Sequence, residues 1–450
     1  MKFDFIILFN KNQKRMEKFY IYSDLQILLL SMYSDEEIIQ VKEFIETNNL
    51  FENTRKSLST MKLIASIVYA RPELIDNIIK LLSYFENIEI ENYPPRYKWL
   101  SHFTVIWRYK LIDYLLYYSP EKDSEIFDSD INLDNPCINA IYDDDIEQLQ
   151  QLISLNNINL NEPISYFYNF KKSLYNNATL LQYSALFGSI KCFKYLLMNS
   201  ENTDYDSLLK YSIAGGNYGI IHITENGIQN PYTKSNNNLL YLAIQHMNND
   251  LIEYIIDNYD IKINAECYIQ CIYSSNYDAF LAIMEIDENK NINEYGEIGS
   301  TPLDIAAFEG YLNFTKFLFS LNVVDAFKLN NYGHSILRSA MKMENIDTVK
   351  FIIKHNYLSN NYNYKFQDYF YAYFFCNKNI SNLFTIKSNE DDYLYDDTDD
   401  FIEENHCYIK FMKLRNLSKF NNNLKSKIER NKLFKKQIRE YQKTFVIDDQ

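Results

Sequence analysis

The sequence predicts an all-α protein whose larger part is a solenoid of stacked helix pairs, and three observations lead to this fold class. The stretch Gly299–Gly310 predicts a short first helix that begins at Thr301, has Pro302 in its first turn and ends at Gly310. Apolar residues at three- and four-residue spacing then predict an amphipathic second helix. The 450 residues include only 9 glycines and 8 prolines, which favours helices over sheets. Such a pair cannot bury its apolar face alone, so it has to stack on a neighbour.

The same two-helix pattern recurs from about residue 135 onward. Copies begin near residues 135, 179, 207, 238, 266, 301, 335 and 367, so that successive starts lie 28 to 44 residues apart. The widest spacing predicts an insertion, Asn156–Asn177, whereas spacings near 28 leave room only for tight links. We therefore expect a row of seven or eight divergent repeats between residues 134 and 386.

Two of these copies resemble a known family. Thr179–Leu197 and Leu208–Ile221 are similar to the divergent repeats of the large ankyrin-repeat families of protists. In those families a helical region typically precedes the repeats, and the resemblance implies a protein-binding scaffold without naming a partner. Pro302 alone stands at the family's proline position, and most copies lack the glycine before the threonine. These departures argue against the usual hairpins in the middle repeats.

Residues 1–133 carry no repeat pattern and are predicted to form an α-helical N-terminal domain. Ser34 and Glu37 have the spacing of a capping box at the start of a helix. Met61–Val68 and Leu74–Phe85 continue with helical periodicity. The segment Asp123–Asn135, rich in Asp and Asn, predicts a boundary loop before the repeats.

Charge changes sharply after the repeats. Residues 387–407 are predicted to be an acidic linker, because positions 390–404 hold nine acids and no base. Residues 408–450 carry twelve Lys or Arg against four acids, a local charge of +8, and are predicted to form a basic amphipathic helix. Since the whole chain has a charge of −15, the remainder carries −23, which argues against nucleic-acid binding by that remainder.

Three interpretations of the basic helix stay open. It could dock on the acidic body of the chain, or it could pair with a partner as a coiled coil. It could also contact nucleic acid or an anionic membrane, an interpretation that includes a nuclear signal at Lys432–Lys436.

No set of residues points to catalysis, a cofactor or a metal. The six histidines form no H-E-x-x-H motif, the six cysteines form no C-x-x-C motif, and no glycine-rich phosphate loop is present. The sequence therefore predicts a chain that is not an enzyme, with no catalytic, cofactor-binding or metal-ligating residues and no small-molecule substrate. No stretch approaches the roughly 20 apolar residues of a membrane helix. A cytoplasmic location is expected, with a nuclear one left open.

The function that these observations favour is that of a non-catalytic scaffold or adaptor that recognises other proteins through its repeats. The best-formed repeats, residues 293–353, are expected to carry the surface. Nine side chains of first helices and preceding loops are predicted to project from it: Tyr295, Glu297, Asp304, Phe308, Glu309, Tyr332, His334, Arg338 and Lys342. Because the first five include three acids, a basic or mixed-charge partner is expected. In the alternative, the repeats are an internal scaffold and the basic helix 408–450 binds nucleic acid or an anionic membrane.

Overall fold

The computed structural model describes residues 13–85, 135–164, 178–228 and 237–356, together with the isolated positions Asp368, Cys376, Ile380 and Leu383. Eighteen α-helices lie in these ranges, with one isolated antiparallel bridge between Ile164 and Ala178. The described residues belong to one compact unit, except Asp368, which belongs to a second. The predicted acidic linker 387–407 and basic helix 408–450 lie outside the described residues, as do most of the repeat predicted near residue 367.

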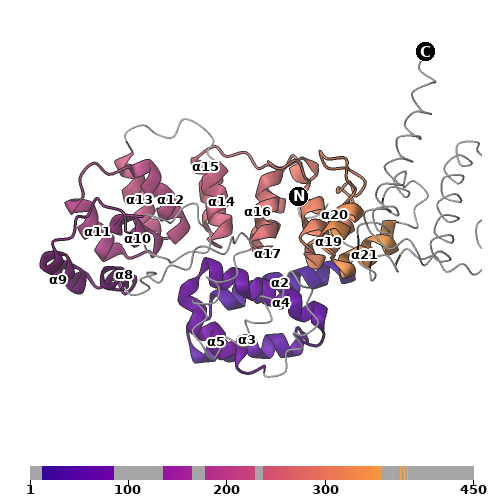
Figure 1. The fold of residues 1–450 in the computed structure, drawn as a ribbon, viewed down its shortest axis with the longest axis horizontal. Helices are drawn as coiled ribbons and strands as arrows, with labels where there is room; N and C mark the ends of the chain where they lie inside the picture. The colour runs from indigo at the N-terminus through magenta and orange to yellow at the C-terminus, as the bar shows by residue number, and fades with distance from the viewer. Residues whose placement is uncertain are drawn as a thin grey trace, which may run out of the picture. The chain divides into compact units, whose positions relative to one another are not determined.

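Seven helix pairs follow one another in a row in the described part of the chain (Figure 1). The first helices of the pairs are α8 (Pro136–Tyr142), α10 (Leu180–Leu186), α12 (Tyr205–Gly215), α14 (Asn237–Gln245), α16 (Ala265–Tyr273), α18 (Pro302–Phe308) and α20 (Ile336–Lys342). The second helices are α9 (Ile146–Asn156), α11 (Ile190–Asn199), α13 (Tyr218–Gly227), α15 (Leu251–Asn258), α17 (Tyr277–Ile286), α19 (Leu312–Ser320) and α21 (Ile346–Asn356). The predicted solenoid of stacked pairs is confirmed over this range.

The pattern around Thr301 folds as its chemistry requires. The Thr301 hydroxyl accepts a hydrogen bond from the backbone N–H of Asp304, and Pro302 occupies the first turn of α18. Gly310 has a φ of +69°, a left-handed conformation that glycine adopts without strain. First helices of the row contain small residues that are fully buried, such as Ala185, Ala243 and Cys271.

A ladder of asparagines at the turns within the pairs fixes how each pair sits on the one before. The side-chain amide of Asn217 donates to the carbonyl of Gly188 at 2.9 Å. Asn248 donates to the carbonyls of Ile213 and Ala214 at 2.8 and 2.9 Å. Asn276 and Asn345 reach the corresponding ends of α14 and α18 in the same way. Each asparagine thus satisfies carbonyls that the end of a helix leaves without an intrahelical partner.

Four N-terminal helices, which we call the N-terminal layer, lie against the second helices of the later repeats (Figure 1). They are α2 (Gln13–Leu30), α3 (Asp35–Thr47), α4 (Thr54–Ala70) and α5 (Ile75–Leu82), with a 3-10 turn, η1 (Pro72–Leu74), before the last. The predicted capping box of Ser34 and Glu37 is present at the start of α3. The layer packs directly on α17 and α19 through α2. The domain boundary at residue 133 stays a prediction, because residues 86–134 lie outside the described ranges.

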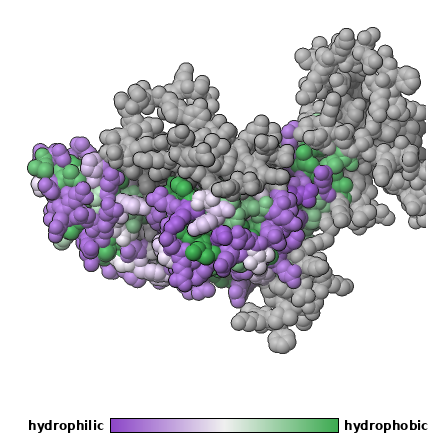
Figure 2. All heavy atoms as spheres, turned by 90° about the horizontal axis from the view of Figure 1, so that it is seen from below, coloured by the Kyte–Doolittle hydropathy of each residue, from purple (hydrophilic) through white to green (hydrophobic). Residues whose placement is uncertain are grey.

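The outward side of the N-terminal layer differs from the side that meets the repeats. In Figure 2, which views the molecule from below, hydrophilic side chains predominate on the coloured surface and hydrophobic areas are small. The side of α2 that meets the repeats carries Phe19, which is 1% exposed and stacks on Phe317 of α19. α2 therefore buries an aromatic side chain against the solenoid, while α3 packs on α2 and α5 within the layer.

Candidate functional site

Two loops between helix pairs form compact tips that we call finger 1 (residues 294–300) and finger 2 (residues 328–334). In finger 1 the N–H of Gly296 donates to the carbonyl of Ser300 at 3.0 Å. In finger 2 the N–H of Asn330 donates to the carbonyl of His334 at 3.1 Å. Gly299 and Gly333 supply the left-handed turns, with φ of +75° and +70°. A bond of 2.8 Å from the N–H of Asn331 to the carbonyl of Gly299 joins the fingers side by side.

Large apolar side chains are exposed on and beside these fingers. The exposed fraction is 40% for Tyr295, 53% for Ile298, 47% for Phe327 and 71% for Tyr332. We call these four residues, with Lys342 on the neighbouring helix, the finger surface. Apolar groups clustered in this way are typical of a site where another protein binds.

Finger 1 is held in place by a chain of polar side chains across the first helices. Gln245 Nε2 donates to Gln270 Oε1 at 2.6 Å, and Gln270 Nε2 donates to Glu266 Oε1 at 2.6 Å. The other oxygen of the buried Glu266 accepts the N–H of Glu297 at 2.9 Å. A Cβ at Gly296 would come within 2.6 Å of that carboxylate, so only glycine permits this close approach.

The face of α20 next to finger 2 is basic. Arg338 and Lys342 are four residues apart on α20 and so lie on one side of the helix, and His334 of finger 2 precedes its first turn. The ammonium of Lys342 lies 5.8 Å from the centre of the Phe308 ring on α18. Burial, and then the positive charges of Arg338 and Lys342, lower the pKa of His334 below its ordinary value.

Of the nine predicted recognition residues, Tyr295, Glu297, Tyr332 and Lys342 are exposed, and Phe308, Glu309, His334 and Arg338 are partly buried. The structure brings Phe308 of α18 close to Lys342 of α20, and His334 of finger 2 close to Arg338 and Lys342. Glu309, the C-cap of α18 directly after Phe308, has its backbone carbonyl bonded by Lys62 of the N-terminal layer.

The expectation that Asp304 projects from the surface is wrong, because its side chain is only 2% exposed. Its Oδ2 accepts a hydrogen bond from Asn330 Nδ2 at 3.1 Å. The side-chain carbonyl of Asn330 in turn accepts the N–H groups of Tyr332 and His334 at 3.0 and 2.9 Å. Asp304 therefore supports finger 2 from below, and the acidic share of the predicted surface is smaller than the sequence suggested.

Sequence reasoning missed Ile298, Phe327 and Lys328. The Lys328 ammonium lies 4.2 Å from the centre of the Tyr295 ring and donates to the carbonyl of Asn293 at 2.7 Å, so it braces finger 1 against finger 2. Apolar residues beside the loop glycines Gly296 and Gly299 were the available signal, because loops normally carry polar side chains.

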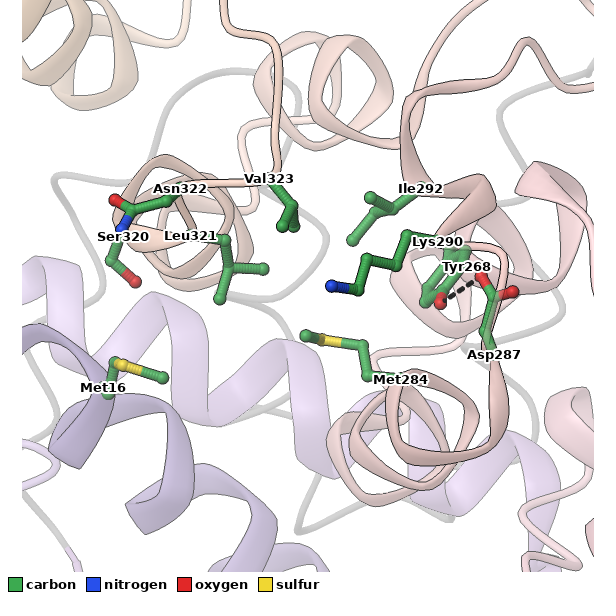
Figure 3. A pocket seen from close by; sticks show the side chains of 10 residues that line it. All are labelled: Met16, Tyr268, Met284, Asp287, Lys290, Ile292, Ser320, Leu321, Asn322 and Val323. Carbon is green, nitrogen blue, oxygen red and sulfur yellow. Dashed lines mark hydrogen bonds between the residues drawn. The ribbon is translucent and has the colours of Figure 1, made fainter. Parts of the chain in front are cut away.

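An open cleft lies at the other side of the repeats, where Met16 of α2 meets the loops after α17 and α19 (Figure 3). Its walls are mainly apolar and include Met284, Leu321 and Val323, and the Lys290 side chain reaches between them (Figure 3). Asp287, at its edge, accepts the hydroxyl of Tyr268 at 2.9 Å and is directed away from Lys290. This lining suits packing rather than proton transfer.

Within the described ranges, no group of three or more His, Cys, Asp or Glu could hold a metal ion. Burial raises the pKa of the thiols of Cys192 and Cys267 to about 12, which keeps them protonated. Of the helices that the structure describes, none is both long and apolar enough to cross a membrane.

Comparison with known proteins supplies a resemblance rather than an identity. Residues 198–283 match the model of a family described as a domain of unknown function, DUF3447. No curated protein matches. Among solved structures, the ankyrin-repeat domain of human ASB11 is 17% identical, with 48% of this chain and 97% of that domain covered and a TM-score of 0.35. The ankyrin-repeat domain of Bcl-3 is 14% identical, with 48% and 98% covered and a TM-score of 0.30.

A third resemblance is to a structure of the Bd0816 predatory endopeptidase from Bdellovibrio bacteriovorus in complex with the immunity protein Bd3460. The identity is 19%, 49% of this chain and 98% of that chain are covered, and the TM-score is 0.28. Each of these three structures is similar to about half of this chain.

Proposed function

We propose that this chain is a non-catalytic scaffold that recognises another protein through the finger surface. The observation that carries the proposal is the exposure of Tyr295, Ile298, Phe327 and Tyr332 on and beside two fingers that are hydrogen-bonded to each other. Because the fingers are already ordered, binding would fix few additional bonds and lose little conformational entropy. Tyrosine is also among the residues that contribute most to binding free energy at protein interfaces.

The charges around the finger surface favour a mixed-charge partner. Glu294 and Glu297 are exposed on finger 1, while Lys342 is exposed on α20, which also carries Arg338 and follows His334 of finger 2. A partner with basic groups opposite finger 1 and acidic groups opposite α20 would match the charges of both regions. Such complementarity sets orientation and partner choice more than affinity.

A pair of charge insertions tests the proposal. We expect Ile298→Glu combined with Tyr332→Glu in the full chain to reduce the recovery of co-purified proteins at least tenfold, since each change removes an apolar contact and adds a buried charge. The matched control is Leu155→Glu with Met198→Glu, whose wild-type side chains are 73% and 79% exposed on α9 and α11. Full recovery of every partner by the finger variant, or equal loss by the control, would contradict the proposal.

A second candidate function rests on the charge of +8 carried by residues 408–450. In it the repeats are an internal scaffold and this segment binds nucleic acid or an anionic membrane. Truncation after Asn389 tests it with a labelled DNA duplex and with phosphatidylserine vesicles. Binding that disappears on truncation would support this function, and its persistence would count against it.

We also propose a cytoplasmic location. Cys137, Cys192, Cys267, Cys271 and Cys376 are free thiols in the structure, which suits a reducing compartment. Fractionation of cells that express a tagged chain checks this, and recovery in secreted material would contradict it.

A further inference from the structure

The N-terminal layer reaches the repeats that carry the fingers through a buried glutamine. Gln26 on α2 is 0% exposed, although its side chain is polar. Its Nε2 donates to Asn276 Oδ1 at 2.7 Å, and its Oε1 accepts the N–H groups of Tyr277 and Asp278 at 2.8 and 3.2 Å. Gln26 therefore caps the N-terminus of α17, a position usually served by a residue of the helix's own chain segment.

Lys62 on α4 makes a similar contact from the N-terminal layer, at the C-terminal end of the first helix α18. Its side chain is 7% exposed, and its ammonium donates to the carbonyls of Glu309 and Gly310 at 3.3 and 3.2 Å. The ammonium also lies 4.1 Å from the centre of the Tyr311 ring. A cation at this position interacts favourably with the negative end of the α18 dipole.

Lys62 and Asn345 each bond different backbone carbonyls at the end of α18. The Asn345 amide donates hydrogen bonds to the carbonyls of Ala307 and Phe308, at 3.2 and 2.7 Å. The Lys62 ammonium donates to the next two carbonyls, those of Glu309 and Gly310. Four successive carbonyls at the end of α18 are thus satisfied by two side chains from different parts of the chain. This double attachment fixes both the position and the direction of α18.

An aromatic contact joins the layer to the second helices between these polar ones. The Phe19 ring is stacked on Phe317 at 4.0 Å between centres and meets Tyr277 and Phe314 edge-on at 4.9 and 5.0 Å. Phe19 is 1% exposed, so the groove between α17 and α19 is filled by the layer. Aromatic pairs of this kind add to the hydrophobic contribution of burial.

The helix that Lys62 holds is also the one that supports both fingers. α18 has 7 residues, so its two ends lie only about 10 Å apart. At its start, Asp304 binds Asn330 under finger 2, and the Gly296–Ser300 turn of finger 1 leads directly into Thr301. A rotation of α18 about its contact with Lys62 would therefore displace both fingers.

We infer that Gln26 and Lys62 are positioning residues for the finger surface, acting from the opposite side of the solenoid. The inference rests on the proposed function for its biological meaning, although its geometric part does not require a partner. The N-terminal layer then belongs to the recognition module, and partner binding depends on residues that the partner never touches.

Amide hydrogen exchange of the full chain, followed by mass spectrometry, tests this inference. Lys62→Met keeps the length of the side chain and removes its charge. We expect exchange in peptides that cover residues 294–311 and 328–335 to rise about tenfold, because the end of α18 loses two charge-assisted hydrogen bonds. Peptides of α10 and α12 should exchange as in the wild type, and Lys62→Arg should restore protection at the fingers.

The control variant is Lys56→Met on the same helix, because Lys56 pairs with Glu52 at 2.8 Å within the layer. It should leave the fingers unchanged. If Lys62→Met does not fold, the milder Gln26→Asn takes its place with the same readout. A rise that is uniform over the chain, or unchanged exchange at the fingers, would overturn the inference. Finger variants that bind normally would instead contradict the proposed function alone.

Discussion

The first and second halves of the solenoid use the same helix pair in different surroundings. Between α8 and α13, residues 200–204 join α11 to α12 as a tight link, whereas residues 157–179 separate α9 from α10. From α16 to α20 the links Asp287–Thr301 and Leu321–Ser335 are long and carry the fingers. Gln26 and Lys62 of the N-terminal layer reach turns in this second half, at Asn276 and Glu309, and Arg71 reaches Asn248 between α14 and α15.

The difference shows how a divergent repeat can present long loops in a fixed position. A loop is held only by the helices at its two ends, and a helix of two turns is itself a small anchor. In the first half, Asn217 attaches its helix pair to the carbonyl of Gly188 in the pair before. In the second half the layer adds contacts from behind, so that the helices that support the fingers are fixed at both ends.

Among variants that distinguish the two halves of the solenoid, Phe19→Ala is expected to have the largest effect on stability. Removal of this buried ring leaves a cavity between α17 and α19, with an expected loss of about 3–5 kcal/mol of unfolding free energy. Hydrogen exchange should rise in α17 and α19 first. Phe193→Ala, which empties an equally buried site on α11, should instead raise exchange in α10–α13. Similar exchange patterns in the two variants would show that the halves are not distinct.

A smaller effect is expected from the asparagine ladder. Asn276→Ala removes the donor to the Ile244 carbonyl and also leaves the Gln26 amide without its acceptor, with an expected cost of about 3 kcal/mol. Asn217→Ala has no such link to the layer and should cost about 1 kcal/mol. Urea denaturation of both variants measures the difference, and equal losses would mean that the layer adds nothing at this turn.

The smallest effect concerns pH. Burial and the charges of Arg338 and Lys342 lower the pKa of His334. The imidazole therefore binds a proton less readily in the folded state than in the unfolded state, where it titrates near pH 6.5. This group therefore does not affect stability well above pH 6.5, and it reduces stability as pH falls through that value toward the lowered pKa. His334→Gln should flatten this part of the profile. An NMR titration of His334 with a midpoint at or above 6.5 would contradict the assignment.

Local features of the fold were predictable because their causes lie close together in the sequence. The Thr301 cap, the Gly310 turn and the Ser34 capping box each involve residues a few positions apart. The stack followed from the apolar second helices. Tyr295 and Tyr332, predicted for the surface, are exposed, but their role in binding stays a prediction.

Long-range contacts were not predictable from the same signals. Gln26 and Asn276 are 250 positions apart, and nothing near Gln26 marks it as the cap of a distant helix. Asp304 is buried because Asn330 reaches it from the next loop, whereas its own helix places it where an exposed residue is expected. These positions depend on which elements meet, and that information is spread over the chain.

Site-specific photo-crosslinking from finger 2 tests the central claim most directly. A photoreactive phenylalanine analogue placed at Tyr332, 71% exposed at the tip of finger 2, should form covalent adducts with a discrete partner protein in cells. The same analogue at Leu155, 73% exposed on α9, should form none with that partner. Equal adducts from both positions, or adducts from Leu155 alone, would contradict recognition through the finger surface.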